Sequence, residues 1–345
     1  MTRRLVFATA LVMMSLVAAS SVSTQAPAGA APPSPSPSAQ TFATAPAQGR
    51  GGRGGQYRSK VTMQMMEEWM TRYSNWGRWG KGDRMGTLNL ITPAKRLQAA
   101  KLVKTGEVIS LAKPIVAREG ITTPHPTQFF GRGGVESAYA TADDYVRERQ
   151  EIEFHGLTMT HYDALCHVSW RGRLYNDLPR PDVVSATRGC SELDGTTAKQ
   201  GIITRGVYIE MIGRHVTPSD VEAWEKKTGI RIQPGDALIL KTKERGSDNA
   251  MGTGWDMEMM PFLKSRDIAI LASDGTGDGA TIPEQMLPLH AMTIVALGMP
   301  LIDHMYLDDI SVAVEKSHRY EFMLVVEPLP IKSSSGSAVN PLAIF

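Results

Sequence analysis

Three histidines and one aspartate lie within thirteen residues of a chain that has only eight histidines: His155, His161, Asp163 and His167. Imidazole nitrogens and carboxylate oxygens are the ligands that divalent transition metals prefer, and a hydrolytic metal site also needs a nearby base. The pattern therefore predicts a metal-dependent hydrolase. The alternative, that His161 and His167 are hydrogen-bonded core residues, would leave several clustered polar groups to satisfy among apolar neighbours.

The local structure expected for this segment brings three of the groups together. If residues 151–161 are extended, alternate side chains share one face, so His161 and Asp163 can point at one ion. If a helix begins near Asp163, His167 lies on the same side of it, one turn later. In an extended chain His155 would lie ~20 Å from His161, so a bulge or bend would be required for the two to share an ion. We therefore expect one metal ion rather than two.

Composition indicates a globular protein. The chain has 345 residues, 42% of them hydrophobic, which is enough for one large core or two ordinary ones. Its formal net charge of +2 is small and evenly spread, so we expect neither nucleic acid nor an anionic membrane as a partner. A repeat of fixed period is also lacking, which argues against solenoids and propellers.

The N-terminus resembles an export signal followed by a linker. Arg3 and Arg4 precede an apolar run over residues 5–19 and then small residues, so residues 1–30 are predicted to be a signal peptide of the general secretory or twin-arginine type. An uncleaved anchor is the alternative, but the run is shorter than the ~20 apolar residues of a spanning helix. Residues 31–60 are rich in Ala, Pro, Ser and Gly and are expected to be disordered. We expect a periplasmic or extracellular protein without stable membrane insertion after cleavage.

Cys166 and Cys190 are the only cysteines, which excludes a disulfide framework. Cys166 directly precedes His167, and we interpret it as a small buried side chain in the wall of the site rather than as a metal ligand. A single bridge between the two cysteines remains open.

Residues 61–345 alternate helix and strand signals. Two Thr-Pro pairs, at Thr92 and Thr217, predict helices that end before Gly106 and at Gly229. Compact apolar runs rich in β-branched residues predict strands at residues 207–211, 237–240, 268–271 and 322–326. We expect one α/β domain with much sheet.

The segment His161-Tyr-Asp163-Ala-Leu-Cys-His167 resembles the H-x-D-x-x-x-H core of the cyclase-like metal-dependent hydrolases, the family of bacterial kynurenine formamidase and isatin hydrolase. Further segments resemble its longer members in the same order: Trp76-Gly-Arg-Trp-Gly-Lys-Gly-Asp83, Gly86-Thr-Leu-Asn89, Pro234-Gly-Asp236, Ser273-Asp274-Gly275, Pro288-Leu-His290, Gly298-Met-Pro-Leu-Ile-Asp303 and Gly336-Ser-Ala-Val-Asn-Pro341. The resemblance covers roughly residues 70–345. It implies a single β-rich α/β domain with a mixed sheet and flanking helices, and a homo-oligomer, most simply a dimer.

The resemblance also implies roles for individual residues. His161 and Asp163 match metal ligands, and His167 matches the histidine that donates and accepts a proton. His290 matches a further histidine of the metal site, and Asp303 stands where several members have a glutamate ligand. From the residues alone, His290 could instead cap the buried helix expected over the apolar residues that follow it, and Asp303 could lie in a solvated turn.

One position departs from the family pattern. The family's first histidine lies four residues before the second, and Leu157 occupies that position here, with His155 as the nearest alternative. Trp170, Phe129 and Phe130 are candidates for binding a flat aromatic substrate, although aromatic residues mostly fill cores.

The resemblance implies hydrolysis of a C–N amide bond, in an aryl formamide or a cyclic amide, or of a lactone. We expect the attacking water to be activated by Zn²⁺ or Mn²⁺. His167 would act as general acid and base, because the unperturbed histidine pKa of ~6.5 suits both directions. The alternative is a catalytically inactive, exported small-molecule-binding protein on the same fold.

Overall fold

A nine-stranded mixed β-sheet runs through the part of the chain that the computed structural model describes, which is residues 59–115, 152–156, 159–247, 253–282 and 285–345. Four neighbouring strands are parallel: β7 (Ile202–Glu210), β9 (Ala237–Lys241), β11 (Ile270–Ser273) and β12 (Leu301–Asp303). Antiparallel strands extend the sheet at both ends: β13 (Glu321–Val326), β15 (Leu342–Ile344) and β1 (Val108–Ser110) beyond β7, and β2 (His161–Asp163) and β14 (Gly336–Ala338) beyond β12. The predicted α/β class with a mixed sheet is confirmed.

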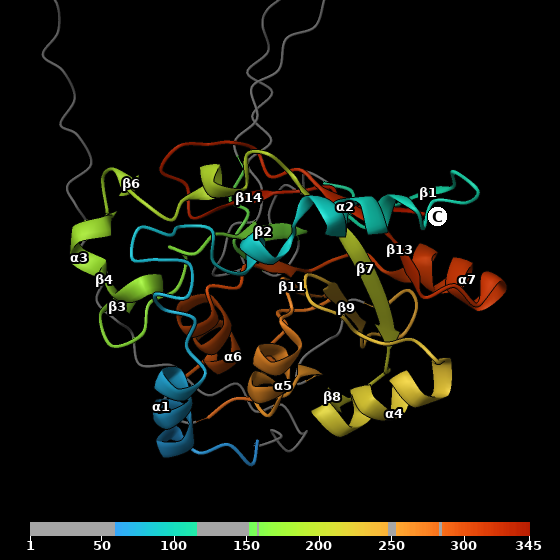
Figure 1. The fold of residues 1–345 in the computed structure, drawn as a ribbon, viewed down its shortest axis with the longest axis horizontal. Coiled ribbons are helices and arrows are strands. Elements are labelled where there is room, and N and C mark those ends of the chain that lie inside the picture. Colours follow the sequence, from blue (N-terminus) through green and yellow to red (C-terminus); the bar gives the residue numbers. More distant parts are fainter. Residues whose placement is uncertain (1–58, 116–151, 157–158, 248–252, 283–284) are drawn as a thin grey trace, which may run out of the picture. The chain divides into compact units, whose positions relative to one another are not determined.

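Helices cover both faces of this sheet (Figure 1). On one face lie α2 (Pro93–Ala100) and α7 (Asp308–Ser317). On the other lie α1 (Met63–Arg72), α4 (Pro218–Thr228), α5 (Met259–Arg266), α6 (Pro288–His290) and a π-helix over Ala291–Leu297. Because both faces are buried, β9 and β11 are apolar along nearly their whole length. In β9, Leu238 and Leu240 enter one core, and Ala237 and Ile239 enter the other.

Short elements connect these layers. Three two-stranded pairs are formed by β3 (Arg173–Leu174) with β4 (Leu178–Pro179), β5 (Val184–Ser185) with β6 (Gly189–Cys190), and β8 (His215–Val216) with β10 (Gly254–Trp255). Single turns of helix are α3 (Arg180–Val183) and the 3₁₀ segments Gly86–Leu90, Tyr175–Asp177 and Gly195–Ala198. None of the helices within the described ranges has both the length and the apolar character needed to cross a bilayer.

Both predicted helix starts are confirmed. The Thr92 hydroxyl accepts a hydrogen bond from the Lys95 amide at the start of α2. Thr217 and Asp220 form a reciprocal capping box at the start of α4, which ends at Gly229 with a φ of 75°. Residues 1–58, which include the predicted signal peptide and nearly all of the predicted linker, lie outside the described residues, as do Phe129 and Phe130.

A close backbone contact explains the glycine in the segment Gly86-Thr-Leu-Asn89. The Thr87 amide donates to the Gly298 carbonyl at 2.8 Å, which joins the first 3₁₀ turn to the end of the π-helix. Gly86 has a φ of 57°, and a Cβ at this position would lie 1.9 Å from the Gly298 oxygen. Only a residue without a side chain fits here.

We predict that Gly86→Ala lowers the free energy of unfolding by about 2–3 kcal/mol, because a left-handed φ and a backbone clash add together. Chemical denaturation with global fitting measures the change. Gly82→Ala is the matched control, because a Cβ there meets nothing within 4 Å. Equal unfolding free energies for the two variants would contradict the prediction.

Candidate metal centre

Strand β2 positions the first two side chains of the centre. His161 and Asp163 lie on one face of the strand, while Tyr162 between them enters the opposite core. Asp303 on β12 is the direct cross-strand partner of His161 in this antiparallel pair. Adjacent strands thus bring together residues that are 142 positions apart in sequence, which is the normal consequence of cross-strand pairing.

His155 also reaches this cluster, so the expectation of an extended segment over residues 151–161 was wrong. The chain bends at His155 and Gly156, and only His161–Asp163 is strand. The His155 Nε2 atom lies 2.8 Å from Ser335 Oγ, and its Nδ1 atom lies 3.1 Å from Asp163 Oδ1. The bend packs against Gly336, where a Cβ would lie 2.1 Å from the Tyr162 carbonyl oxygen and 3.1 Å from the His155 ring.

His167 reaches the cluster from a turn rather than from the predicted helix. Its amide donates to the Ala164 carbonyl at 2.9 Å, which closes a single turn directly after β2. The His167 Nε2 atom lies 4.0 Å from Asp163 Oδ2. Its ring stacks on the His155 ring, with centroids 3.8 Å apart and planes 12° from parallel.

His290 lies at the end of α6 and approaches the cluster from the helices that cover this face of the sheet. Its Nε2 atom lies 3.3 Å from Asp163 Oδ2 and 3.3 Å from Asp303 Oδ2. Its Nδ1 atom contacts the carboxylate of Asp278, whose other oxygen accepts the Leu289 amide at 2.7 Å. Asp278 is a residue that sequence reasoning missed. The available signal was an aspartate between two glycines, three residues after the segment Ser273-Asp274-Gly275.

These side chains form two groups that share Asp163. In each group the candidate ligand atoms lie within 4.8 Å of one another: His155, His161 and Asp163 in the first, and Asp163, His290 and Asp303 in the second. Asp163 is fully buried, and among the described residues neither of its oxygens accepts a hydrogen bond with good geometry. Because a buried carboxylate whose oxygens are poorly satisfied is costly, the donor set fits a cation. Because His155 reaches the cluster, the distance argument for a single ion no longer applies.

The pKa shifts of the cluster residues also favour a bound cation. Burial alone would raise the pKa of Asp163, but His167, His155 and His290 outweigh it and hold that pKa well below its usual value. Burial lowers the pKa of His290, yet Asp278 and Asp303 outweigh it and raise that pKa well above normal. The protein groups therefore favour positive charge beside the carboxylates of Asp163 and Asp303.

His167 differs from the other histidines of the cluster in two respects. It belongs to neither candidate ligand group. Burial lowers its pKa to about 4, and the charge of Asp163 only partly opposes this effect. A neutral imidazole that borders the centre without being a candidate ligand can accept a proton.

His304 is a second residue that sequence reasoning left aside. It has a left-handed φ of 54°, which is uncommon for histidine, and it is buried beside the ring of His161 at 5.9 Å between centroids. Neither ring nitrogen has a hydrogen-bond partner within the described part of the chain. A strained, buried and unsatisfied side chain next to a polar cluster is typical of functional sites.

Cys166 and Cys190 form a disulfide next to the cluster. The single bridge that the sequence left open is therefore present. Cys166 is buried, as expected, and it is not free. The bond joins the turn that carries His167 to strand β6.

Two other features singled out in the sequence are not part of the two groups of candidate ligands. Asp236, in the segment Pro234-Gly-Asp236, is buried in ion pairs with Lys95 and Arg205, so it has a structural role. Trp170 is partly buried against the core, with the Arg171 guanidinium 5.0 Å from its ring. Its role in substrate binding stays a prediction.

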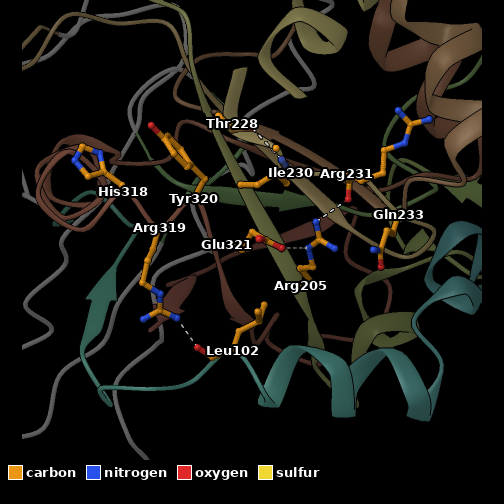
Figure 2. Close-up of a pocket in the computed structure, with 11 residues that line it drawn as sticks. Leu102, Arg205, Thr228, Ile230, Arg231, Gln233, His318, Arg319, Tyr320 and Glu321 are labelled. Carbon is orange, nitrogen blue, oxygen red and sulfur yellow. Dashed lines mark hydrogen bonds and ion pairs between the residues drawn. The ribbon is translucent and has the colours of Figure 1, made fainter. Parts of the chain in front are cut away.

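A cavity of about 570 Å³ lies away from the His/Asp cluster, between the end of α4 and the start of β13 (Figure 2). Its polar groups largely satisfy one another. Arg205 pairs with Glu321 at 2.8 Å and donates to the Arg231 carbonyl, and Arg319 donates to the Leu102 carbonyl. This cavity therefore lies where the end of α4, strand β7 and the start of β13 meet, and we propose no catalytic or binding role for it.

Comparison with known proteins places this geometry in a family. The sequence model of the cyclase family, described as "Putative cyclase", matches residues 87–277, which include His155, His161, Asp163 and His167. A crystal structure described as a novel cyclase is 25% identical, with a TM-score of 0.68 over 80% of this chain and 99% of that one.

Two isatin hydrolases are more distant. Isatin hydrolase A from Labrenzia aggregata, bound to benzyl benzoate, is 18% identical with a TM-score of 0.48 over 73% of this chain and 98% of that one. Isatin hydrolase A from Ralstonia solanacearum is 17% identical with a TM-score of 0.48 over 69% of this chain and 91% of that one. Among curated proteins, none matches the chain significantly. From the family match, this chain is a member of the cyclase family.

Proposed function

We propose that this protein is a metal-dependent hydrolase that cleaves a C–N amide bond in a small non-peptide substrate. The observation that carries the proposal is the carboxylate of Asp163, which is fully buried, accepts no hydrogen bond of good geometry from the described residues and is shared by two groups of candidate ligands. Membership of the cyclase family, whose kynurenine formamidase and isatin hydrolase members the sequence resembles, supports the reaction class.

A mixed set of imidazole and carboxylate ligands suits Zn²⁺ or Mn²⁺. When bound, such a cation polarises a substrate carbonyl and acidifies water near neutral pH. The residues that would hold it are His155, His161 and Asp163 on one side, and Asp163, His290 and Asp303 on the other.

His167 supplies the proton transfer. Its Nε2 atom faces the centre beside Asp163 Oδ2 but is not one of the candidate ligand atoms. It accepts a proton from the attacking water and returns that proton to the departing nitrogen, which makes the amine a better leaving group. Stacking on the His155 ring fixes the plane of the imidazole for both transfers.

The substrate we propose is an aryl formamide, a cyclic amide or a lactone, and Trp170, Phe129 and Phe130 remain candidates to bind its aromatic part. His304 adds a buried donor or acceptor beside His161 for a polar substrate atom. We further propose that the protein is exported and forms a homodimer. The buried disulfide supports export, because such bonds persist in oxidising compartments.

We predict that His167→Ala lowers kcat by about 10²–10⁴-fold while the metal content stays unchanged, because proton transfer is lost and no ligand is removed. Asp163→Ala is expected to lose the metal, because it removes the carboxylate common to both groups. Elemental analysis together with hydrolysis of formanilide, isatin and simple lactones measures both effects.

His318→Asn is the control, because His318 is exposed at the end of α7 and asparagine tolerates its φ of 55°. If the metal-loaded wild type binds these compounds and releases them unchanged, the inactive binding protein is the correct alternative. Loss of metal in His167→Ala would contradict the role assigned to His167.

Asp278 gives an independent test of the ligand set. By holding His290 Nδ1, it directs Nε2 toward the carboxylates of Asp163 and Asp303. We predict that Asp278→Asn weakens metal binding by about 10–100-fold, because the partner that orients a ligand histidine is lost. Competition with a chromophoric chelator measures the affinity. Asp309→Asn, at an exposed position in α7, should bind metal like the wild type, and equal affinities of both variants would argue against His290 as a ligand.

A further inference from the structure

The disulfide Cys166–Cys190 lies directly next to His167, the proposed proton-transfer residue. Cys166 is the residue directly before His167, and both belong to the single turn that follows β2. Cys190 ends β6, the second strand of a hairpin that otherwise contributes nothing to the cluster. The bond is thus the covalent link between this hairpin and the backbone that carries His167.

Hydrogen bonds around the bond connect the same two segments to a third. The Cys166 amide donates to the Leu193 carbonyl at 3.1 Å, and the Cys190 amide donates to the Ser333 carbonyl at 2.9 Å. The Ala164 amide donates to the Ser335 carbonyl at 2.9 Å. Ser335 is also the residue whose hydroxyl contacts His155 Nε2. The disulfide and these hydrogen bonds therefore join three segments next to the cluster, which we call the supporting segments: residues 164–167, 189–195 and 333–336.

The position of His167 depends on the supporting segments more than the positions of His161 and Asp163 do. His161 and Asp163 are fixed by ladder pairing with β12 and β14 on both sides. His167 lies beyond the end of the strand, and the backbone bond that closes its turn is the single donation to Ala164. A turn of this kind adopts alternative conformations readily unless another constraint holds it.

We propose that the Cys166–Cys190 disulfide is a positioning device that holds His167 at the metal centre, so that full turnover requires the oxidised protein. The inference rests on the proposed hydrolase function. The bond forms when the two thiols lose two protons and two electrons to a second disulfide, such as that of an oxidising dithiol protein, which becomes a dithiol. Both cysteines are buried, at 4% and 3% exposure, so the bond is set during folding and does not act as a rapid sensor.

The kinetic experiment compares the oxidised wild type with Cys166→Ser, Cys190→Ser and the double variant, all loaded with the same metal. We expect each of the three to lose kcat by about tenfold or more, since small misplacement of a catalytic group is costly, while KM changes less than twofold. The three losses should be equal, because one bond is removed in every case. Metal content should stay at the wild-type value.

A cycle with His167→Ala separates positioning from general damage. If the disulfide acts through His167, the double cysteine variant should cause no further loss of kcat in the His167→Ala background. A further tenfold loss in that background, or unequal losses in the two single variants, would overturn the proposal.

Hydrogen–deuterium exchange tests the same idea without turnover and without relying on the variants to fold. The wild type is reduced with a phosphine, checked for free thiols by mass spectrometry and compared with the oxidised form. Exchange of peptides covering residues 164–168 should accelerate, while peptides of β7 should not change. Unchanged exchange at residues 164–168 would refute the positioning role, whereas absence of hydrolysis by the oxidised, metal-loaded wild type would refute the proposed function instead.

Discussion

The buried carboxylate of Asp163 is the constraint on which the site depends. It is fully buried, the described residues give it no hydrogen bond of good geometry, and three histidine side chains reach within 3.6 Å of its oxygens. A charged group in this environment is stable only when positive charge or donors surround it. The histidines and the proposed cation satisfy this requirement, and the ring of His290 is in turn held by Asp278.

The fold supplies this arrangement by placing β2 between β12 and β14 at one end of a sheet that is covered on both faces. Antiparallel pairing with β12 sets Asp303 opposite His161, and pairing with β14 sets Gly336 opposite Asp163. A Cβ at Gly336 would lie 2.1 Å from the Tyr162 carbonyl oxygen, so a glycine is needed for this close pairing. Three of the candidate ligands, His161, Asp163 and Asp303, lie on strands, whereas His290 lies at the end of a buried helix and His155 at a bend. The proposed proton-transfer residue comes from a turn, which places it close to the centre without making it a candidate ligand.

The chain departs locally from the family pattern before Asp163. The histidine that the family pattern expects at position 157 is absent, and His155 takes a place beside Asp163 through a bend. The distance argument against His155 failed because it assumed an extended backbone over the whole segment. Nothing in the local pattern of apolar residues specifies that bend, which depends on Ser335 and Gly336, about 180 residues later.

Local chemistry in the sequence was sufficient for the helix starts at Thr92 and Thr217, for the main buried strands and for the α/β class, because caps and apolar runs act over a few residues. It also indicated His161, Asp163 and His167 as one cluster, since two residues on one strand share a face. The tertiary structure alone decided the partnership of His290 with Asp278, the turn at His167, the approach of His155 and the pairing of the two cysteines. These contacts join segments far apart in sequence or bends without a local signature, so strand pairing and packing had to specify them.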